Sequence, residues 1–197
     1  MGRSSQSKAK ENRAQIVQTA SRLFREAGVE NVSVAQIMTA NGMTVGGFYK
    51  HFESKDALIE EAFSLAFEQS RETWDEVYNR ADEASQDRAA TLVRQYLRNS
   101  SAKYRCPLLA FAPGVSLPKG GRPGAHEYEE GAKSLLDKFM REKVGGLGDL
   151  AQPTDAENEA LVIFAAMVGA RLLAQSAGQQ GWVQAMEAAV TIAAKKR

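Results

Sequence analysis

Hydrophobic residues recur every three or four positions along almost the whole chain, which is the spacing of helices that bury one face. No segment shows the strict alternation of a half-buried strand. The first helix is predicted over residues 8–27 and ends at Gly28, because glycine readily adopts the left-handed conformation that terminates helices. Its apolar face comprises Ile16, Ala20, Leu23, Phe24 and Ala27. The pattern predicts an all-α fold of about nine helices.

Two short helices are predicted next, joined by a tight turn. Ser33 and Gln36 have the spacing of a capping box at the start of a helix over residues 34–40. Gly42 lies in the turn, where it tolerates a positive φ, and Thr44 is predicted to cap the next helix, over 45–51. The apolar residues expected to pack these helices together are Ala35, Ile37, Met38, Met43, Val45, Phe48 and Phe52. Two short helices around a glycine-containing turn are typical of a helix-turn-helix motif.

The second helix of such a motif enters the DNA major groove, so its exposed face must be small or polar. Here that face offers Thr44, Gly46, Gly47, Tyr49 and Lys50. Each glycine weakens a helix by roughly 1 kcal/mol relative to alanine, and close approach of the backbone to DNA would explain both. Side chains able to donate to phosphates are Ser33, Thr44, Tyr49, Lys50, His51 and Lys55. Tyr49 and His51 have an alternative interpretation, in which they only close the small core.

The stretch SVAQI at Ser33, followed by GMTVGGFYKHFESKDAL from Gly42, resembles the DNA-binding domain of TetR-type repressors. Met38 and Asn41 depart from the family pattern, which usually has alanine at both positions. The resemblance implies that Tyr49 and His51 contact phosphates and that Thr44, Val45, Gly46 and Gly47 line the groove. It places Lys55 at the start of the fourth helix, which Ser54 is expected to cap.

The charge distribution agrees with a DNA partner at the N-terminal end. Residues 1–55 carry eight Lys and Arg against four Glu, although the whole chain has a net charge of only +1. An excess of positive charge at one end favours a polyanion partner there. The basic residues that precede the motif, Arg3, Lys8, Lys10 and Arg13, resemble the arm that some family members lay on the DNA backbone. A frayed, solvated terminus is the alternative.

Residues 56–197 are predicted to form a second, all-helical domain behind the DNA-binding domain of residues 1–55. After the fourth helix, helices are expected over 86–103, 126–144, 155–175 and 179–195, with a short helix and a loop where prolines interrupt residues 107–123. Thr154 and Glu157 form a second capping box. The resemblance implies a small-molecule pocket in this domain and a homodimer formed through the last two helices.

Aromatic residues of the second domain are the candidates for ligand binding. They are Phe67, Trp74, Tyr96, Tyr104, Phe111, Phe139 and Phe164. Ordinary core packing is the alternative for each of them. The small residues of the segment 164–170 suit close helix packing, either within one chain or across a two-fold dimer interface.

Cys106 precedes Pro107, and proline favours the first position of a helix, so Cys106 is predicted at a helix N-cap. A helix start and the nearby Lys103 and Arg105 would lower the pKa of a thiol and make it reactive toward oxidants or electrophiles. A small buried hydrophobic residue is the alternative. Some TetR-like repressors with a cysteine near this place are thiol sensors.

No motif indicates an enzyme, a metal site or a cofactor. The two histidines, His51 and His126, lie far apart, and no phosphate loop or nucleophile elbow is present. A single cysteine and the absence of an apolar leader favour the cytoplasm, and the apolar stretch 161–174 is too short to span a membrane.

The sequence therefore predicts a dimeric transcriptional regulator, most simply a repressor. A small molecule or modification of Cys106 would release it from a palindromic operator in double-stranded DNA. The alternative is a thiol-dependent enzyme or small-molecule-binding protein that retains the fold without recognising DNA.

Overall fold

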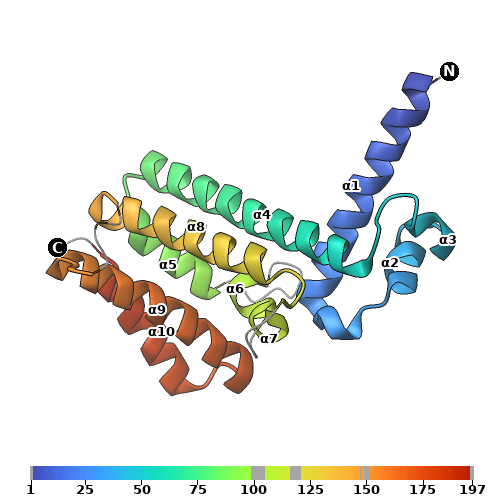
Figure 1. Cartoon of the computed structure of the whole chain (residues 1–197). Helices are drawn as coiled ribbons and strands as arrows, with labels where there is room; N and C mark the ends of the chain where they lie inside the picture. The colour runs from blue at the N-terminus through green and yellow to red at the C-terminus, as the bar shows by residue number, and fades with distance from the viewer. Residues whose placement is uncertain (1, 99–104, 116–120, 147, 149–150, 196–197) are drawn as a thin grey trace. The chain divides into compact units, whose positions relative to one another are not determined.

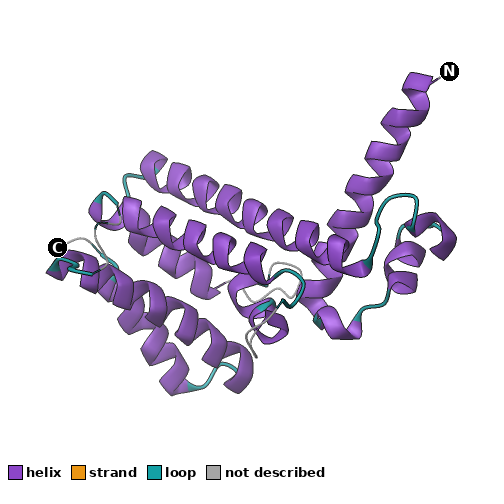
Figure 2. Cartoon of the chain, viewed as in Figure 1, coloured by secondary structure: helices purple, strands orange, loops and turns teal. Residues whose placement is uncertain are grey.

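The computed structural model describes residues 2–98, 105–115, 121–146, 148 and 151–195, with the backbone alone for residues 2–5. Within these ranges the chain forms ten α-helices, one short 3-10 helix (η1) and no strand, so the all-α prediction is confirmed (Figures 1 and 2). The elements are α1 (Gly2–Ala27), η1 (Val29–Asn31), α2 (Val34–Ala40), α3 (Val45–Phe48), α4 (Lys55–Glu83), α5 (Arg88–Arg98), α6 (Pro107–Ala110), α7 (Ala112–Val115), α8 (Ala125–Val144), α9 (Asp155–Ala177) and α10 (Gly181–Ala193).

The chain divides into two compact units, and α4 and α8 contribute residues to both. The first unit comprises Met1–Glu68 and Ala102–Gly131, and the second comprises Gln69–Ser101 and Ala132–Arg197. These units are defined by packing. The division into a DNA-binding domain of residues 1–55 and a second domain of residues 56–197 stays a prediction.

The core of the first unit is built from α1 to α4 together with α6 and the start of α8. Ile16, Phe24, Ile37 and Phe48 are completely buried among these helices. Farther along α4, the Phe63 ring stacks on Phe111 with centroids 3.8 Å apart. Large apolar side chains removed from water supply most of the stability of such a unit.

The second unit packs α5, α9 and α10 together. Leu92 and Val93 of α5, Met167 of α9 and Val183 of α10 are buried. Arg171 is also buried, and its guanidinium donates a hydrogen bond of 3.0 Å to the carbonyl of Leu97 in the last turn of α5. A cation at this position satisfies a carbonyl that has no partner within its own helix.

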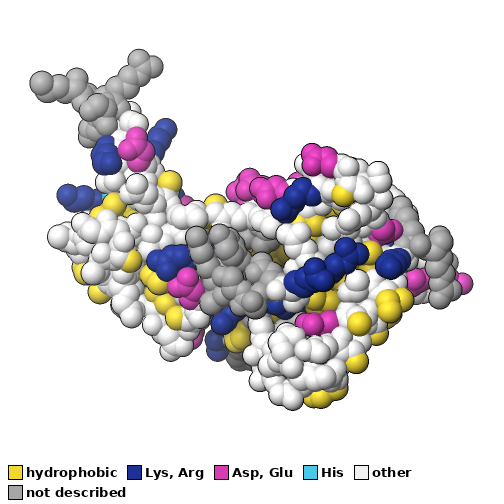
Figure 3. Space-filling model, turned by 180° about the vertical axis from the view of Figure 1, so that it is seen from behind, with side chains coloured by type: hydrophobic (Ala, Val, Ile, Leu, Met, Phe, Trp, Pro, Cys, Tyr) yellow, Lys and Arg dark blue, Asp and Glu magenta, His cyan; other side chains and the backbone are white. Residues whose placement is uncertain are grey.

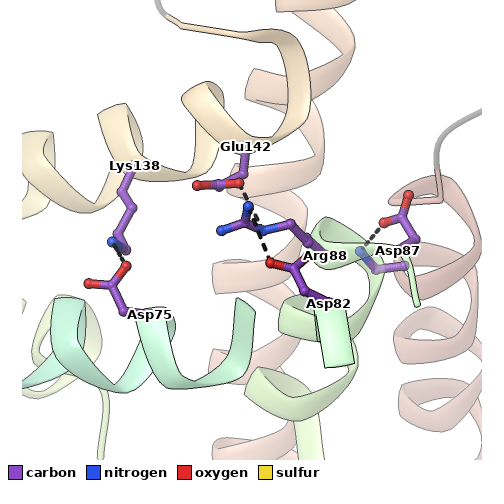
Figure 4. A network of polar contacts seen from close by, with 7 residues as sticks. Asp75, Asp82, Asp87, Arg88, Lys138 and Glu142 are labelled. Atoms are coloured by element: carbon purple, nitrogen blue, oxygen red, sulfur yellow. Dashed lines mark hydrogen bonds and ion pairs between the residues drawn. The ribbon is translucent and has the colours of Figure 1, made fainter. Parts of the chain in front are cut away.

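A polar network fastens α4, α5 and α8 at the surface of the second unit (Figure 4). Arg88 pairs with Glu142 at 3.1 Å and with Asp82 at 3.7 Å, and Lys138 pairs with Asp75. The Arg88 guanidinium also lies 4.9 Å from the centre of the buried Tyr78 ring. Burial is the main cause that raises the pKa of Tyr78, so its hydroxyl stays neutral.

Both predicted capping boxes are confirmed. The Ser33 hydroxyl accepts from the Gln36 amide at 3.2 Å while the Gln36 side chain accepts from the Ser33 amide at 2.7 Å. Thr154 and Glu157 make the same reciprocal pair at the start of α9. Hydrogen bonds from Thr154 and Gly148 lower the pKa of Glu157, which therefore keeps its charge.

Three local predictions were wrong in detail. Helix α1 begins at Gly2, six residues before the predicted start, because the residues ahead of Lys8 include no proline and continue the helix without a break. Helix α3 ends at Phe48 and continues only as turns through His51, whose amide bonds to the Phe48 carbonyl at 2.8 Å. The Thr44 side chain, placed at the N-cap of α3, makes no capping hydrogen bond.

Candidate nucleic-acid interface

The helix-turn-helix of α2 and α3 lies against α1 and is held there by an asparagine (Figure 1). The Asn41 side chain accepts from the Thr19 hydroxyl of α1 at 3.0 Å and donates to the Ile37 carbonyl at 2.8 Å. Gly42 follows with a φ of 67°. Asn41, where the family pattern has alanine, therefore connects the turn to α1.

The segment from Thr44 to Lys50 presents one face to the core and one to solvent. Phe48 is completely buried and stacks on Phe52, with centroids 5.5 Å apart. The Tyr49 ring meets the buried Phe48 ring edge-on, with centroids 5.2 Å apart, while 70% of Tyr49 is exposed, and Lys50 is also exposed. Both interpretations of Tyr49, closing the core and contacting phosphate, stay predictions. His51 is half-buried.

The two glycines of α3 are not required by packing within the chain. A Cβ atom at Gly46 would have no neighbour within 4 Å, and one at Gly47 would make ordinary contacts of 3.7 Å with Met38 and Thr44. Neither glycine has a positive φ. Alanine would fit at both positions and would favour the helix, so packing within the chain does not explain the two glycines.

Two of the predicted phosphate donors are engaged inside the protein. Lys55 begins α4, as the resemblance implied, and its ammonium group donates to the Val29 carbonyl at 2.9 Å. The Ser33 hydroxyl belongs to the capping box. Contacts of these two side chains with phosphate stay predictions, while Thr44, Val45, Gly46, Tyr49 and Lys50 are exposed.

The basic N-terminal extension is helical. Lysine and arginine side chains line the exposed part of α1 (Figure 3), where Lys8 pairs with Glu11 at 3.5 Å. Arg13 has a structural role, because it makes a two-pronged ion pair with Glu61 of α4 and lies 4.4 Å from the centre of the Phe52 ring. The hydrogen bonds to Glu61 raise the pKa of Arg13 above its usual value, so the guanidinium stays charged. The side chain of Arg3 is outside the described residues.

The aromatic ligand-binding candidates fall into two groups. Phe67 and Phe111 are buried in the first unit, where the Phe67 ring also meets Tyr128 edge-on at 5.7 Å. In the second unit, Trp74 and Phe139 both contact Phe164, with centroids 6.5 and 5.7 Å apart. Tyr96 is half-buried on α5, and Tyr104 is outside the described residues. Each group is also a good apolar core, so ligand binding by these residues stays a prediction.

Cys106 occupies the N-cap of α6, as predicted, and is half-buried. Its backbone carbonyl accepts from the amides of Leu109 and Ala110 at 3.0 and 2.9 Å. Burial is the largest cause that raises the pKa of the Tyr128 hydroxyl, and the nearby Cys106 is the second. This hydroxyl donates to the Leu108 carbonyl at 2.9 Å.

Among the described residues, no three His, Cys, Asp or Glu side chains lie close enough to hold a metal ion.

Large hydrophobic side chains are exposed at two places in the described part of the chain. Two of them, Val45 and Tyr49, belong to the helix-turn-helix. The other five lie on α9 and α10 and are Val162, Leu172, Leu173, Trp182 and Ile192. Helix α9 (Asp155–Ala177) is long and apolar enough to cross a membrane by length and composition alone, which corrects the expectation that its apolar stretch, residues 161–174, is too short. Sequence reasoning did not single out these five residues, although apolar positions on all sides of a helix indicate burial by a further partner.

Comparisons with known proteins agree with this geometry. Residues 16–62 match the family described as bacterial regulatory proteins, tetR family. The HTH-type transcriptional regulator AcrR of Shigella flexneri is 38% identical over 66 residues, which are 34% of this chain and 31% of that protein. The match therefore spans about a third of that relative's length.

Similarity of fold extends over nearly the whole chain. A TetR transcriptional regulator from Chloroflexus aurantiacus superposes with a TM-score of 0.73 at 25% identity, covering 94% of this chain and 95% of that one. The reduced form of NemR from Escherichia coli, at 17% identity, shares the fold with a TM-score of 0.75 over 94% of this chain and 98% of that one. In the sequence of residues 16–62 and in its fold, the chain is therefore similar to bacterial regulatory proteins of the tetR family.

Proposed function

We propose that this protein is a homodimeric transcriptional regulator that binds operator DNA through α3 and the residues just after it. A repressor that a small molecule releases from a palindromic operator is the simplest form of this function. The observation that carries the proposal is the exposed face formed by Thr44, Gly46, Tyr49 and Lys50. This face belongs to the N-terminal DNA-binding region of residues 1–55, called the head from here on, and residues 16–62 of the chain match the tetR family model. A protein without DNA recognition would have no use for these donors or for glycines that internal packing does not require.

The electrostatic part of the proposal is tested with Lys50. Wild-type protein is expected to bind selected genomic fragments with an affinity that falls as salt rises, because phosphate contacts release counterions. In Lys50→Gln, the slope of log affinity against log salt should be less steep by about one, since one phosphate contact is lost. Fluorescence anisotropy over a series of salt concentrations measures this slope.

Arg98→Gln is the matched control, because it removes one exposed positive charge from α5. Its salt slope should equal that of the wild type. Equal slopes for Lys50→Gln and wild type would exclude a phosphate contact by Lys50, and the absence of salt-dependent binding to any fragment would contradict the proposed function.

A dimer formed through α9 and α10 follows from the five exposed hydrophobic residues on these helices. Burying such side chains between two copies would remove apolar surface from water and would explain why α9 is so apolar. Two copies related by a two-fold axis would also present two α3 helices to the two halves of a palindrome.

The signal that releases the DNA is proposed to be a small apolar or aromatic molecule. The aromatic groups around Phe67 and Phe164 provide the surfaces that would recognise it. The relatives named above are regulators, so this proposal includes no catalytic step, and it places the protein in the cytoplasm with the DNA.

We propose modification of Cys106 as a second signal. Cys106 is half-buried and lies near the Tyr128 hydroxyl, so oxidation of the sulfur would alter packing in the first unit. One protein of the same fold, NemR, was solved in a reduced form. Hydrogen peroxide would transfer one oxygen atom to the thiolate, giving a sulfenic acid and hydroxide. Peroxide is expected to weaken DNA binding by the wild type severalfold and to leave Cys106→Ser unaffected. An equal loss in both proteins, measured by anisotropy, would exclude Cys106 as the sensor.

A further inference from the structure

Apart from Lys50, which follows the end of α3, the side chains that most often read DNA bases are missing or occupied in residues 28–55. Arginine or lysine commonly pairs with guanine, and asparagine or glutamine with adenine. Residues 28–55 contain no arginine and only three amide side chains. Asn31 donates to the Ala27 carbonyl at 2.9 Å, Gln36 accepts from the Ser33 amide at 2.7 Å, and both ends of the Asn41 amide are hydrogen-bonded. The amide side chains therefore hold the head together.

Val45 is unlike the other apolar residues of the two helices. Ile37, Met38 and Phe48 are completely buried, whereas 46% of Val45 is exposed at the first position of α3. On one side of it Thr44 is exposed and makes no capping hydrogen bond, and on the other side Gly46 opens onto empty space. Val45 therefore exposes a branched apolar side chain next to Gly46, and because Gly46 has no side chain the backbone there can approach another molecule closely.

The chemistry of the major groove gives this arrangement a specific complement. Thymine presents a C5-methyl group there, while the edges of the other bases present hydrogen-bond donors and acceptors. Apolar side chains and the methyl group of threonine contact the thymine methyl. Tyr49 and Lys50 follow the end of α3 and are exposed, so they remain available to phosphates.

We propose that Val45, together with the methyl group of Thr44, determines the sequence specificity of this protein by packing against thymine C5-methyl groups in the major groove. This inference rests on the proposed function and adds the base that is read and the residue that reads it. Removing one thymine methyl should weaken binding about fourfold, the effect of one buried methyl group.

The test separates the methyl group from every other property of the base. Wild-type protein first selects its preferred sequence from a random double-stranded DNA library, and each thymine of that sequence is then replaced in turn by deoxyuridine. At one or two positions in each half-site, deoxyuridine should weaken wild-type binding about fourfold. At the positions that Val45 contacts, Val45→Ala should lose most of this difference, and Val45→Thr, which keeps the branched shape, should retain part of it. At a position that Thr44 contacts, Thr44→Ser, which removes only the methyl group, should lose the difference while Val45→Ala keeps it.

Several outcomes would overturn the inference. If every sensitive thymine methyl mattered equally to wild type and Val45→Ala, contact with Val45 would be excluded. Selection of the same sequence by both proteins would show that Val45 does not determine the specificity, which would then come from other base contacts or from DNA shape. Salt-dependent binding without any preferred sequence would also contradict it while leaving DNA binding itself intact. Absence of all DNA binding would instead overturn the proposed function. Thermal melting by circular dichroism shows whether Val45→Ala is folded, which its exposure leads us to expect.

Discussion

Replacing Trp182 and Ile192 by glutamate should convert the protein from a dimer to a monomer and weaken binding to a full operator by a factor of about one hundred or more. Their side chains are 53% and 67% exposed in the single chain, so the fold of one protomer does not need them. In the proposed dimer they would be buried, and the two carboxylates of each protomer, four in all and without partners, would oppose association. The operator affinity falls because the second half-site no longer binds as part of the same complex.

Light scattering coupled to size-exclusion chromatography gives the oligomeric state, and titration of full and half operators gives the affinities. Half-site binding should be unchanged. Gln184→Glu is the matched control, because it adds the same charge at an exposed polar position of α10 and should leave the dimer intact. A double variant that remains a dimer would exclude this surface as the interface.

Gly46→Ala should change stability and DNA binding in opposite directions. The added methyl group meets nothing in the chain and the backbone has no positive φ, so alanine should stabilise the folded head by about 0.5–1 kcal/mol. The same methyl group would keep α3 away from the DNA, and a misfit of this kind is expected to weaken binding about tenfold, a cost of about 1.4 kcal/mol. Thermal melting and anisotropy titration measure the two effects.

Gly181→Ala is the control for this second prediction, because Gly181 also has no neighbour within 4 Å and lies in the first turn of α10. It should leave operator affinity unchanged. Unaltered binding by a folded Gly46→Ala would show that α3 does not approach DNA closely at this position.

The helix order could be predicted from the sequence because its signals are local. The capping boxes at Ser33 and Thr154 start α2 and α9 where predicted, and Pro107 starts α6 directly after Cys106. The end of α3 was predicted three residues too late, because the side chains from Tyr49 to His51 do not by themselves mark where helical hydrogen bonds give way to turns.

The candidate site was predicted less completely, because several of its contacts join residues far apart in the chain. Tyr49 and Lys50 are exposed, as a groove face requires, and the residue pattern alone indicated this. The pairing of Arg13 with Glu61, 48 positions away, and the bond from Lys55 to the Val29 carbonyl left no sequence signal. Lys55 is predicted as a phosphate donor from its side chain and Arg13 as part of a DNA-contacting arm from the resemblance, and neither ground distinguishes a structural contact from a phosphate contact.

The hydrogen bonds that shape the head come from residues other than those exposed on α3. Asn41 joins the turn to α1, and Ser33 and Gln36 close the start of α2, whereas Val45 and Gly46 make none of the side-chain bonds that hold this region. Substitutions at these two exposed positions can therefore alter the surface that the head offers to a partner without dismantling its architecture. In evolutionary terms, related proteins could acquire new DNA targets through substitutions at one or two of these exposed positions, while the hydrogen bonds that stabilise the helix-turn-helix stay the same.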